Sequence, residues 1–358
     1  MPGPILIDAR AATRPELGGV ERWARELTRR LPELAPGRYE VVRPRPRLVH
    51  RAGHAWEQGV LPWLAARAGA RALLCPANLA PLAFGRNVVV IHDAAALRHP
   101  DWYSQAYAAW QKRVLPALAR RALHVVTVSE FSRSELVDLL DLAPERISVV
   151  YGGVDARFSP LTDPGPARAS LGLRRSYVLC VASHTARKNL GALVPAARAL
   201  ATEGIDVVVA GGHRPQFTAE TSLGALKLLG GVDDELLPGL YAGAELFVLP
   251  SVYEGFGLPV AEAMASGVAV VAADTTALPE TAGGASRLVA PNAEDLSRAL
   301  IGLLGDRVER ARLRAAGLQR ARAFSWDRTA REVDRVLSDS GGRPTGAWRS
   351  PPGGGPPA

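Results

Sequence analysis

The sequence alternates short, unbroken apolar runs with longer amphipathic stretches. Over residues 19–31, apolar side chains recur with the helical period at Val20, Trp23, Leu27 and Leu31. The runs are apolar throughout rather than at every second position, which is typical of strands buried on both faces of a parallel sheet. Strands that alternate with helices form right-handed βαβ units, so we predict an α/β fold with doubly wound parallel sheets. The predicted strands are ILIDA (5–9), RALLC (71–75), NVVVI (87–91), HVVTV (124–128), YVLCVA (177–182), IDVVVA (205–210), LKLLG (226–230), ELFVLP (245–250) and VAVVAA (268–273).

The length of the chain indicates two domains. Its 358 residues exceed one ordinary core. Residues 159–172, SPLTDPGPARASLG, contain three prolines and few large apolar residues, which suits a linker. We therefore predict Rossmann-like domains over residues 1–160 and 173–322, with ligands at the carboxyl ends of the strands. A last helix over 323–340 either stays with the second domain or packs back on the first, and residues 341–358, rich in Pro and Gly, are predicted to be a disordered tail.

Composition limits the compartment and the partners. The net charge of +8 favours an anionic partner, although the arginine content is equally explained by genome composition. Cys75 and Cys180 lie in strand-like runs, which indicates buried thiols and a reducing compartment. No secretory signal or long apolar span is visible, so we expect a cytoplasmic protein. The basic loop 43–51 and the aromatic, cationic stretch 102–123 are either a solvated loop and a packed helix or a contact for an anionic acceptor or the inner membrane surface.

A glycine-broken stretch, SVYEGFGLPVAEAMASG at 251–267, follows one predicted strand. Its glycines permit close approach of a ligand, and the amides at the start of the next helix form an anion site. Glu254 in the loop and Glu262 in the helix could accept hydrogen bonds from vicinal hydroxyls, such as those of a ribose. The alternative is a capping glutamate and a solvated helix residue.

Three further segments that follow predicted strands contain candidate site residues. Arg187 and Lys188, at a strand-to-helix turn, could hold a diphosphate or be two surface cations. The pair Gly18 and Gly19 before a helix suggests a phosphate or sugar near the backbone, or an ordinary turn. His92, followed by Asp93, could contact substrate or transfer a proton, or be a loop histidine without a chemical role. No Cys/His metal spacing, Asp-x-Asp triplet or P-loop occurs, so no metal or other cofactor is expected.

The order and wording of these stretches resemble glycosyltransferase family 4, whose members are retaining, use nucleotide-sugars and have the GT-B fold of two facing Rossmann-like domains with a cleft between them. The resemblance covers residues 5–335 and rests on YAGAELFVLPSVYEGFGLPVAEAMASGVAVVAADTTALPE (241–280), ASHTARKNL (182–190), IHDAAALRHPDWYS (91–104), VTVSEFSRSEL (126–136) and VVYGGVD (149–155). The first-domain stretches resemble mannosyltransferase-like members. Gly152, Ser183 and His184 depart from the commoner family pattern.

The resemblance implies a role for each candidate residue. The first domain would be the acceptor side and the second would bind the nucleotide-sugar. The implied catalytic residues are His92 near the reacting carbon, Arg187 and Lys188 on the diphosphate, and Glu254 on the sugar hydroxyls. The implied donor-binding residues are Gly18, Gly19, Val232, Gly255, Phe256, Gly257, Leu258 and Glu262, with Glu262 on the ribose and the backbone near Val232 on the base.

The implied activity is hexose transfer without metal, with GDP-mannose as the best guess for the donor and UDP- or dTDP-sugars as alternatives. The acceptor would be a glycan, a lipid-linked glycan or a small molecule. A front-face displacement fits the lack of an evident carboxylate nucleophile. A sugar-nucleotide epimerase or hydrolase on the same scaffold and a non-catalytic nucleotide-sugar-binding module are the alternatives. No recognised module supports nucleic-acid binding.

Overall fold

The computed structural model describes residues 3–14, 18–45, 53–212 and 223–340. The tail at 341–358 and most of the basic loop at 43–51, both considered above, lie outside these residues.

The chain divides into two compact units. Unit 1 comprises Met1–Arg98, Ala109–Gly153 and Trp326–Ala358, and unit 2 comprises His99–Ala108 and Val154–Ser325. The chain therefore leaves unit 1 between Gly153 and Val154, before the segment 159–172 that the sequence analysis took for a linker. Residues Gly165–Ser170 of that segment form a helix, α7, within unit 2.

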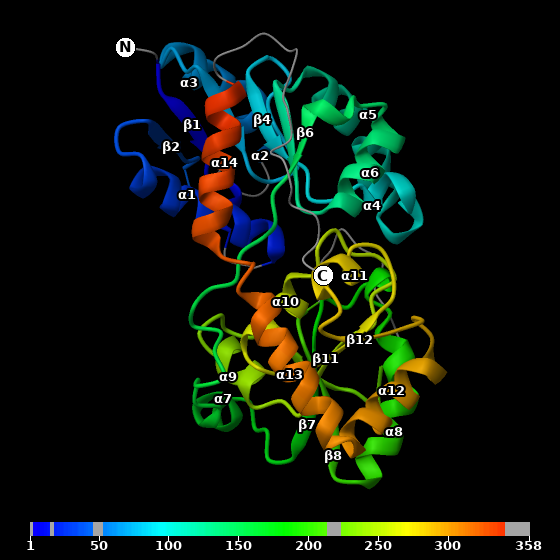
Figure 1. Cartoon of the computed structure of the whole chain (residues 1–358). Helices are drawn as coiled ribbons and strands as arrows, with labels where there is room; N and C mark the ends of the chain where they lie inside the picture. The colour runs from blue at the N-terminus through cyan, green and yellow to red at the C-terminus, as the bar shows by residue number, and fades with distance from the viewer. Residues whose placement is uncertain (1–2, 15–17, 46–52, 213–222, 341–358) are drawn as a thin grey trace. The chain divides into compact units, whose positions relative to one another are not determined.

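The described part of unit 1 contains one six-stranded parallel sheet in the order β2-β1-β3-β4-β5-β6 (Figure 1). Its four central strands are buried at every position, as the unbroken apolar runs predict. The two edge strands, YEVV and ISV, were not predicted because they are short, partly polar and partly accessible. The strands are β1 Ile5–Asp8, β2 Tyr39–Val42, β3 Ala72–Cys75, β4 Asn87–Val90, β5 His124–Thr127 and β6 Ile147–Val149.

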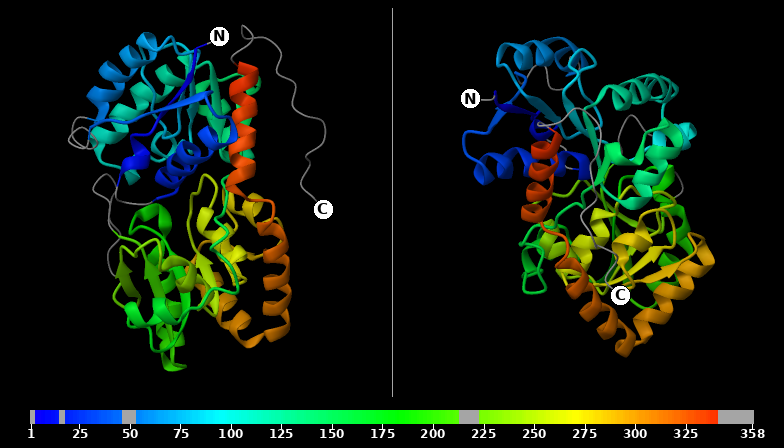
Figure 2. Two further views of the ribbon diagram at one scale, coloured as in Figure 1. Left: turned by 90° about the vertical axis from the view of Figure 1, so that its left-hand side faces the viewer. Right: turned by 45° about the horizontal axis from the view of Figure 1, so that its top comes forward.

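The last helix of the described chain, α14, belongs to unit 1 and packs against α1 (Figures 1 and 2). The indole rings of Trp23 and Trp326 meet edge to face, with centroids 5.8 Å apart, and both are buried. Asp334 and Asp327 on α14 accept hydrogen bonds from Tyr39 and Arg30. The helical segments between Gly19 and Ser340 in this unit are α1 Gly19–Leu34, α2 Gly53–Ala55, the π-helical turn η3 Trp56–Val60, α3 Leu61–Arg67, α4 Ala95–Arg98, α5 Gln105–Arg121 (whose first turn lies in the unit 2 segment), α6 Glu130–Leu140, η5 Pro144–Arg146 and α14 Trp326–Ser340; η1 Ala11–Thr13 precedes them.

Unit 2 contains a second six-stranded parallel sheet in its described residues, in the order β12-β11-β10-β7-β8-β9. The sheet order places β7 beside β10, so the loops after these two strands start from the same edge. The strands are β7 Ser176–Val181, β8 Ile205–Ala210, β9 Lys227–Gly230, β10 Leu246–Leu249, β11 Ala269–Ala273 and β12 Arg287–Val289. The helices are α7, η6 Ala186–Lys188, η7 Leu190–Leu193, α8 Val194–Thr202, α9 Leu237–Ala242, α10 Leu258–Ala265, α11 Leu278–Ala282, α12 Ala293–Gly305 and α13 Arg307–Ala321.

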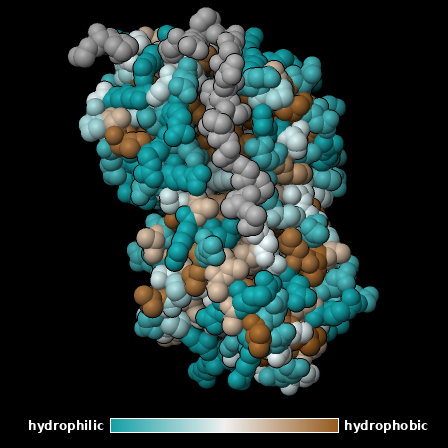
Figure 3. Space-filling view, in the orientation of Figure 1, coloured by the Kyte–Doolittle hydropathy of each residue, from teal (hydrophilic) through white to brown (hydrophobic). Residues whose placement is uncertain are grey.

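The predicted α/β class with two doubly wound sheets is confirmed. Cys75 and Cys180 are buried and free, in agreement with their place in strand-like runs. On the face seen in Figure 3, hydrophobic residues form small separate areas among hydrophilic ones. Within the described ranges, no helix has the length and hydropathy needed to cross a membrane. The cytoplasmic location and the membrane contact stay predictions.

Candidate active site

The loop between β10 and α10 is shaped by its glycines and by the proline that follows. Gly257 has a φ of +93°, and a Cβ there would lie 2.6 Å from a methyl carbon of Leu278. Only glycine fits both the backbone and the space. Pro259 stands in the first turn of α10, where a missing N–H breaks no helical hydrogen bond. The loop is thus fixed immediately after Glu254, and the N–H of Val260 in the first turn of α10 donates to the carbonyl oxygen of Gly257 at 2.9 Å.

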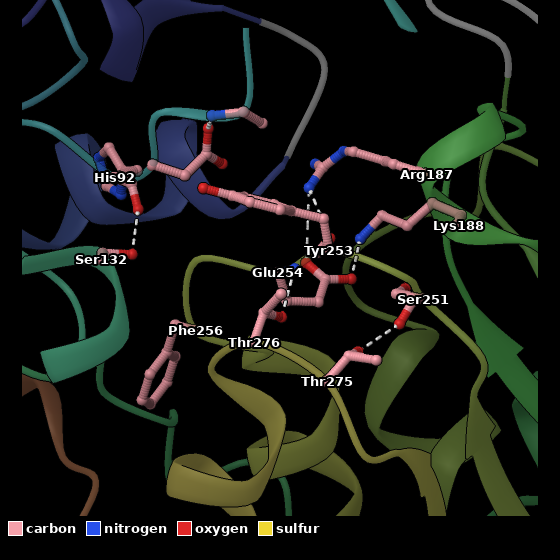
Figure 4. Close-up of polar contacts among 12 residues, drawn as sticks. His92, Ser132, Arg187, Lys188, Ser251, Tyr253, Glu254, Phe256, Thr275 and Thr276 are labelled. Carbon is pink, nitrogen blue, oxygen red and sulfur yellow. Dashed lines mark hydrogen bonds and ion pairs between the residues drawn. The ribbon is translucent and has the colours of Figure 1, made fainter. Parts of the chain in front are cut away.

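Glu254 is held from three sides (Figure 4). Its carboxylate accepts a hydrogen bond from Lys188 Nζ at 2.5 Å, and Arg187 Nη1 lies 3.6 Å from its other oxygen. Its backbone N–H donates to Thr276 Oγ1 at 3.0 Å. The residue is only 6% exposed, and its carboxylate pairs with two cations, which differs from the alternative of a capping glutamate.

The two cations follow β7 on a short 3-10 turn, η6. Asn189 ends this turn in the left-handed conformation, with φ of 53°. Its side-chain amide donates to the carbonyl oxygens of Pro250 and Pro291, at 3.0 and 2.8 Å. Pro250 is the residue that ends the strand-like run of β10, so Asn189 ties the cationic turn to the strand that leads to Glu254. Asparagine suits this place because it tolerates the left-handed conformation and carries two N–H donors.

Burial and charge shift the pKa values of this cluster. Burial lowers the pKa of Lys188 below its ordinary 10.5, and the attraction of Glu254 opposes this shift without cancelling it. For Glu254, burial alone would raise the pKa, but Lys188 and Arg187 outweigh it and hold the pKa below its ordinary value. Glu254 is therefore a carboxylate at neutral pH. Two cations against one carboxylate leave the cluster with a positive surplus at the carboxyl edge of the sheet, which can bind an anion.

Glu262, the second glutamate of this region, is also buried, at 4% exposure. The hydroxyl of Tyr241 donates to its Oε2 at 2.9 Å. Tyr241 lies on α9 and packs edge to face against Phe158. The structure thus anchors one side of the Glu262 carboxylate, and its contact with a ribose stays a prediction.

The remaining predicted donor-binding residues of unit 2 surround this loop. Phe256 is buried against Phe324, with ring centroids 5.3 Å apart, and its carbonyl oxygen accepts from Thr281 Oγ1. Leu258 is the first residue of α10, and Gly255 precedes Phe256 in the loop. Val232 lies after β9, partly buried against the core of unit 2. Their contacts with a donor stay predictions.

Gly18 and Gly19 begin α1 in unit 1. The N–H of Gly18 donates to Glu21 Oε2 at 3.1 Å, which completes a capping arrangement. A Cβ built on Gly19 would meet no atom within 4 Å. Packing within unit 1 therefore does not require glycine at position 19, and the contact of Gly18 and Gly19 with a donor stays a prediction.

His92 is a buried residue of unit 1. Its Nε2 lies 2.9 Å from the carbonyl oxygen of Pro76, and because that oxygen can only accept, Nε2 carries the proton. Burial lowers the pKa of His92, so the ring is neutral near pH 7, with Nδ1 as its acceptor nitrogen. Ser132 donates to its backbone oxygen (Figure 4). Asp93 accepts from the N–H of Ala95 and so caps α4.

The structure brings Arg187, Lys188 and Glu254 together, as the sequence analysis proposed for a site at the carboxyl edge. It also shows supporting residues that the sequence analysis did not single out: Thr276, which positions the Glu254 amide, and Thr275, which donates to Ser251 at 2.9 Å. Both threonines follow β11 directly, so their position at a strand end was the available signal. Among the described residues, no three or more His, Cys, Asp or Glu are grouped so as to hold a metal ion.

Comparison with known proteins shows which families and relatives the chain matches. A family model described as Glycosyltransferase Family 4 matches residues 17–158, and one described as Glycosyl transferases group 1 matches residues 175–306. The chain is 32% identical over 259 residues to the O-antigen chain mannosyltransferase B of Escherichia coli, covering 68% of this chain and 67% of that one. It is 34% identical over 248 residues to the MMP alpha-(1->4)-mannosyltransferase of Mycolicibacterium hassiacum, where the match spans 66% of this chain and 57% of the relative.

Solved structures share the fold. A sucrose-phosphate synthase from Thermosynechococcus elongatus matches with a TM-score of 0.75 at 21% identity, over 94% of this chain and 98% of that one. The Anabaena protein HepE, solved in complex with UDP-glucose, matches with a TM-score of 0.71 at 21% identity, over 94% and 100%. At these identities the likeness establishes the fold, which is that of GT-B glycosyltransferases.

Proposed function

Because this chain belongs to glycosyltransferase family 4 and is a glycosyltransferase, we propose that it moves mannose from GDP-mannose to a glycan acceptor, with retention of configuration and without metal. One observation carries the proposal: Arg187, Lys188 and Glu254 form a buried cluster of two cations and one acid at the carboxyl edge of the sheet, beside the glycine-shaped loop that leads into α10. The curated relatives are named as mannosyltransferases, which supports mannose as the sugar.

The cationic turn would stabilise the departing diphosphate. Cleaving the sugar–phosphate bond leaves negative charge on the phosphate oxygens, and preorganised donors aimed at that charge lower the barrier. Lys188 has three N–H donors and uses one on Glu254, so the others remain for phosphate oxygens. The guanidinium of Arg187 would add further donors. No residue of this set needs a metal ion as an intermediary.

Glu254 would orient the sugar. As a carboxylate whose position is fixed by Lys188 and Thr276, it can accept hydrogen bonds from sugar hydroxyls. Its engagement with two cations makes it a poor nucleophile towards the anomeric carbon, which favours front-face displacement. In this reaction the sugar–phosphate bond breaks, the acceptor oxygen bonds to the same face of the anomeric carbon, and a leaving phosphate oxygen takes the acceptor's proton.

The donor is tested by a thermal-shift panel of GDP-mannose, UDP-glucose, dTDP-glucose and the free nucleoside diphosphates, because a ligand that binds the folded state raises the melting temperature. We expect GDP-mannose to give the largest rise. UDP-glucose is included because HepE was solved with it. A larger rise with UDP-glucose would replace the proposed donor, and no rise with any sugar nucleotide would contradict the donor site itself.

The release of GDP in the presence of a chelator tests whether the reaction needs a metal ion. Release of GDP from GDP-mannose, with and without acceptor glycans, should be unchanged by EDTA. Complete loss of turnover that Mg²⁺ or Mn²⁺ restores would contradict the role given to Arg187 and Lys188. The anomeric configuration of the product, measured by NMR, decides between retention and inversion.

A further inference from the structure

A short segment of the chain, His99–Ala108, belongs to unit 2 although the residues on both sides of it belong to unit 1. Arg98, the last residue before it, is bonded within unit 1, where its guanidinium donates to Glu135 and Asp138 at 2.7 Å. The segment then forms the 3-10 turn η4, Pro100–Trp102. The structure therefore places a stretch that follows β4 and α4 in sequence among the residues of the donor unit.

Two aromatic rings of this segment stack on each other and contact the loop between β10 and α10. The rings of His99 and Trp102 are nearly parallel, with centroids 3.9 Å apart and an interplanar angle of 16°. Both meet the ring of Tyr253 edge to face, at 5.7 and 6.2 Å between centroids. Tyr253 is 2% exposed. Edge-to-face contacts of this kind are a favoured geometry for aromatic pairs and stabilise the rings beyond the area that they bury.

Tyr253 connects this aromatic stack to Glu254, its neighbour in sequence. Its carbonyl oxygen accepts from Arg187 Nη1 at 3.3 Å, and the preceding N–H, that of Val252, donates to the backbone oxygen of Arg187 at 2.9 Å. The backbone is thus held by the cationic turn, and the ring is held by the stack. A ring that loses its stack would turn and move the main chain directly before Glu254.

We propose that His99 and Trp102 are positioning residues for the transferase reaction, which hold Glu254 in place through Tyr253. The inference rests on the proposed function, because it assumes that Glu254 orients the sugar of the donor. It reaches beyond that function by giving a role to a segment outside the donor-binding stretches. Misplacing a group of this kind by about 1 Å can lower the rate by about 10²-fold.

The role predicts a specific split between turnover and nucleotide binding. Trp102→Ala should lower turnover of GDP-mannose about tenfold or more, measured as GDP release, because Glu254 is displaced. The affinity for GDP, measured by calorimetry, should change by less than about twofold, because GDP lacks the sugar that Glu254 would orient. Trp102→Phe keeps a ring that can meet Tyr253, so it should restore turnover to within about threefold of the unmodified protein.

The matched control is Trp63→Ala, since Trp63 is a 58% exposed tryptophan of unit 1, and its turnover should be unchanged. If Trp102→Ala does not fold, His99→Ala removes the other stacked ring, which is only partly buried, and should lower turnover several-fold with GDP affinity retained. If the panel selects another sugar nucleotide, that donor and its nucleoside diphosphate replace GDP-mannose and GDP.

A double-mutant cycle with Glu254→Ala separates positioning from a general structural effect. We expect Glu254→Ala to lower turnover at least tenfold, and Trp102→Ala to cause little further loss in that background. Equal losses in both backgrounds, unchanged turnover in Trp102→Ala, or loss of GDP binding in it would overturn the inference alone. Unchanged turnover in Glu254→Ala would instead overturn the role of Glu254 and remove the premise of the inference.

Discussion

Each unit buries a cluster of charged residues at or near the end of a parallel strand, and the two clusters differ in the ratio of acids to cations. In unit 1, Asp8 ends β1, and Arg10 bonds Glu57 at 2.9 Å, so two acids surround one cation. In unit 2, Lys188 and Arg187 surround one acid, Glu254. The buried cluster that includes the end of β1 therefore has an excess of acids, whereas the cluster after β7 and β10 has an excess of cations.

The pKa values of the acids in the two clusters shift in opposite directions. Burial, and next the neighbouring charge of Glu57, raise the pKa of Asp8 to about 7. Two cations hold the pKa of Glu254 below its ordinary value. A diphosphate placed at the cluster of unit 1 would be repelled by carboxylates. One placed at the cluster of unit 2 would be attracted by the cation that is in excess of the single acid. The sign of the surplus, and not the strand-end position alone, is therefore the reason for proposing the donor site in unit 2.

The largest effect is expected from Arg10→Ala, which breaks the cluster of unit 1. It would leave two buried acids without their cation, and removing one partner of a buried ion pair typically costs about 3–5 kcal/mol in the free energy of unfolding. Urea unfolding measures this. The control is Arg29→Ala, because Arg29 is a half-exposed arginine whose surface pairs contribute about 0–1 kcal/mol.

The affinity for GDP should not depend on the cluster of unit 1. At a temperature where Arg10→Ala is folded, its GDP affinity should match that of the unmodified protein, and a large loss would contradict the separation of the two clusters.

Lys188→Ala breaks the cluster of unit 2. Removing one preorganised donor aimed at developing charge typically lowers the rate by about 10²–10³-fold, and we expect that loss in GDP-mannose turnover. Lys227→Ala is the matched control, because Lys227 lies on β9 and bonds the backbone oxygen of Gly172. Circular dichroism of the variant establishes that it is folded. Turnover near that of the control would remove Lys188 from the mechanism.

The pH dependence of nucleotide binding sharpens the comparison. Because burial lowers the pKa of Lys188, its positive charge is lost, as pH rises, before pH 10.5. The affinity for GDP should therefore fall several-fold as the pH rises, and this fall should occur below pH 10.5. Lys188→Arg keeps its charge there and should bind GDP with little change over the same range. Identical pH profiles for both proteins would contradict this assignment.

The smallest effect concerns Asp8. Its folded-state pKa of about 7 lies above the ordinary 3.8, so the folded protein binds the proton more tightly. The resulting stability is complete below pH 3.8 and is lost as pH rises through 7. Asp8→Asn cannot ionise, and the fall in melting temperature between pH 5 and pH 8 should shrink by about 2–4 °C. An unchanged fall would indicate that Asp8 titrates normally.

Much of the fold could be predicted from the sequence because the central strands are buried on both faces and read as unbroken apolar runs. The edge strands β2, β6 and β12 could not, since they are short and partly accessible. Periodicity could not assign α14 to a unit, because the partner of its apolar face, Trp23 on α1, is about 300 residues away in sequence, a separation no local pattern reports.

The site was predictable to a similar extent. Strand ends and turn residues located Arg187, Lys188 and Glu254, but spacing could not reveal that they bond one another, because 66 residues separate Lys188 from Glu254. Asn189 shows the same limit: its two carbonyl partners come from other loops. The segment His99–Ala108 gave no local signal that it joins the donor unit.

Isothermal calorimetry of GDP, UDP and ADP binding to the unmodified protein and to Lys188→Ala tests the central claim most directly. The account predicts binding of at least one nucleoside diphosphate at submillimolar concentration, weakened at least tenfold in Lys188→Ala. No binding of any nucleoside diphosphate or sugar nucleotide at millimolar concentration, or equal binding by both proteins, would contradict it.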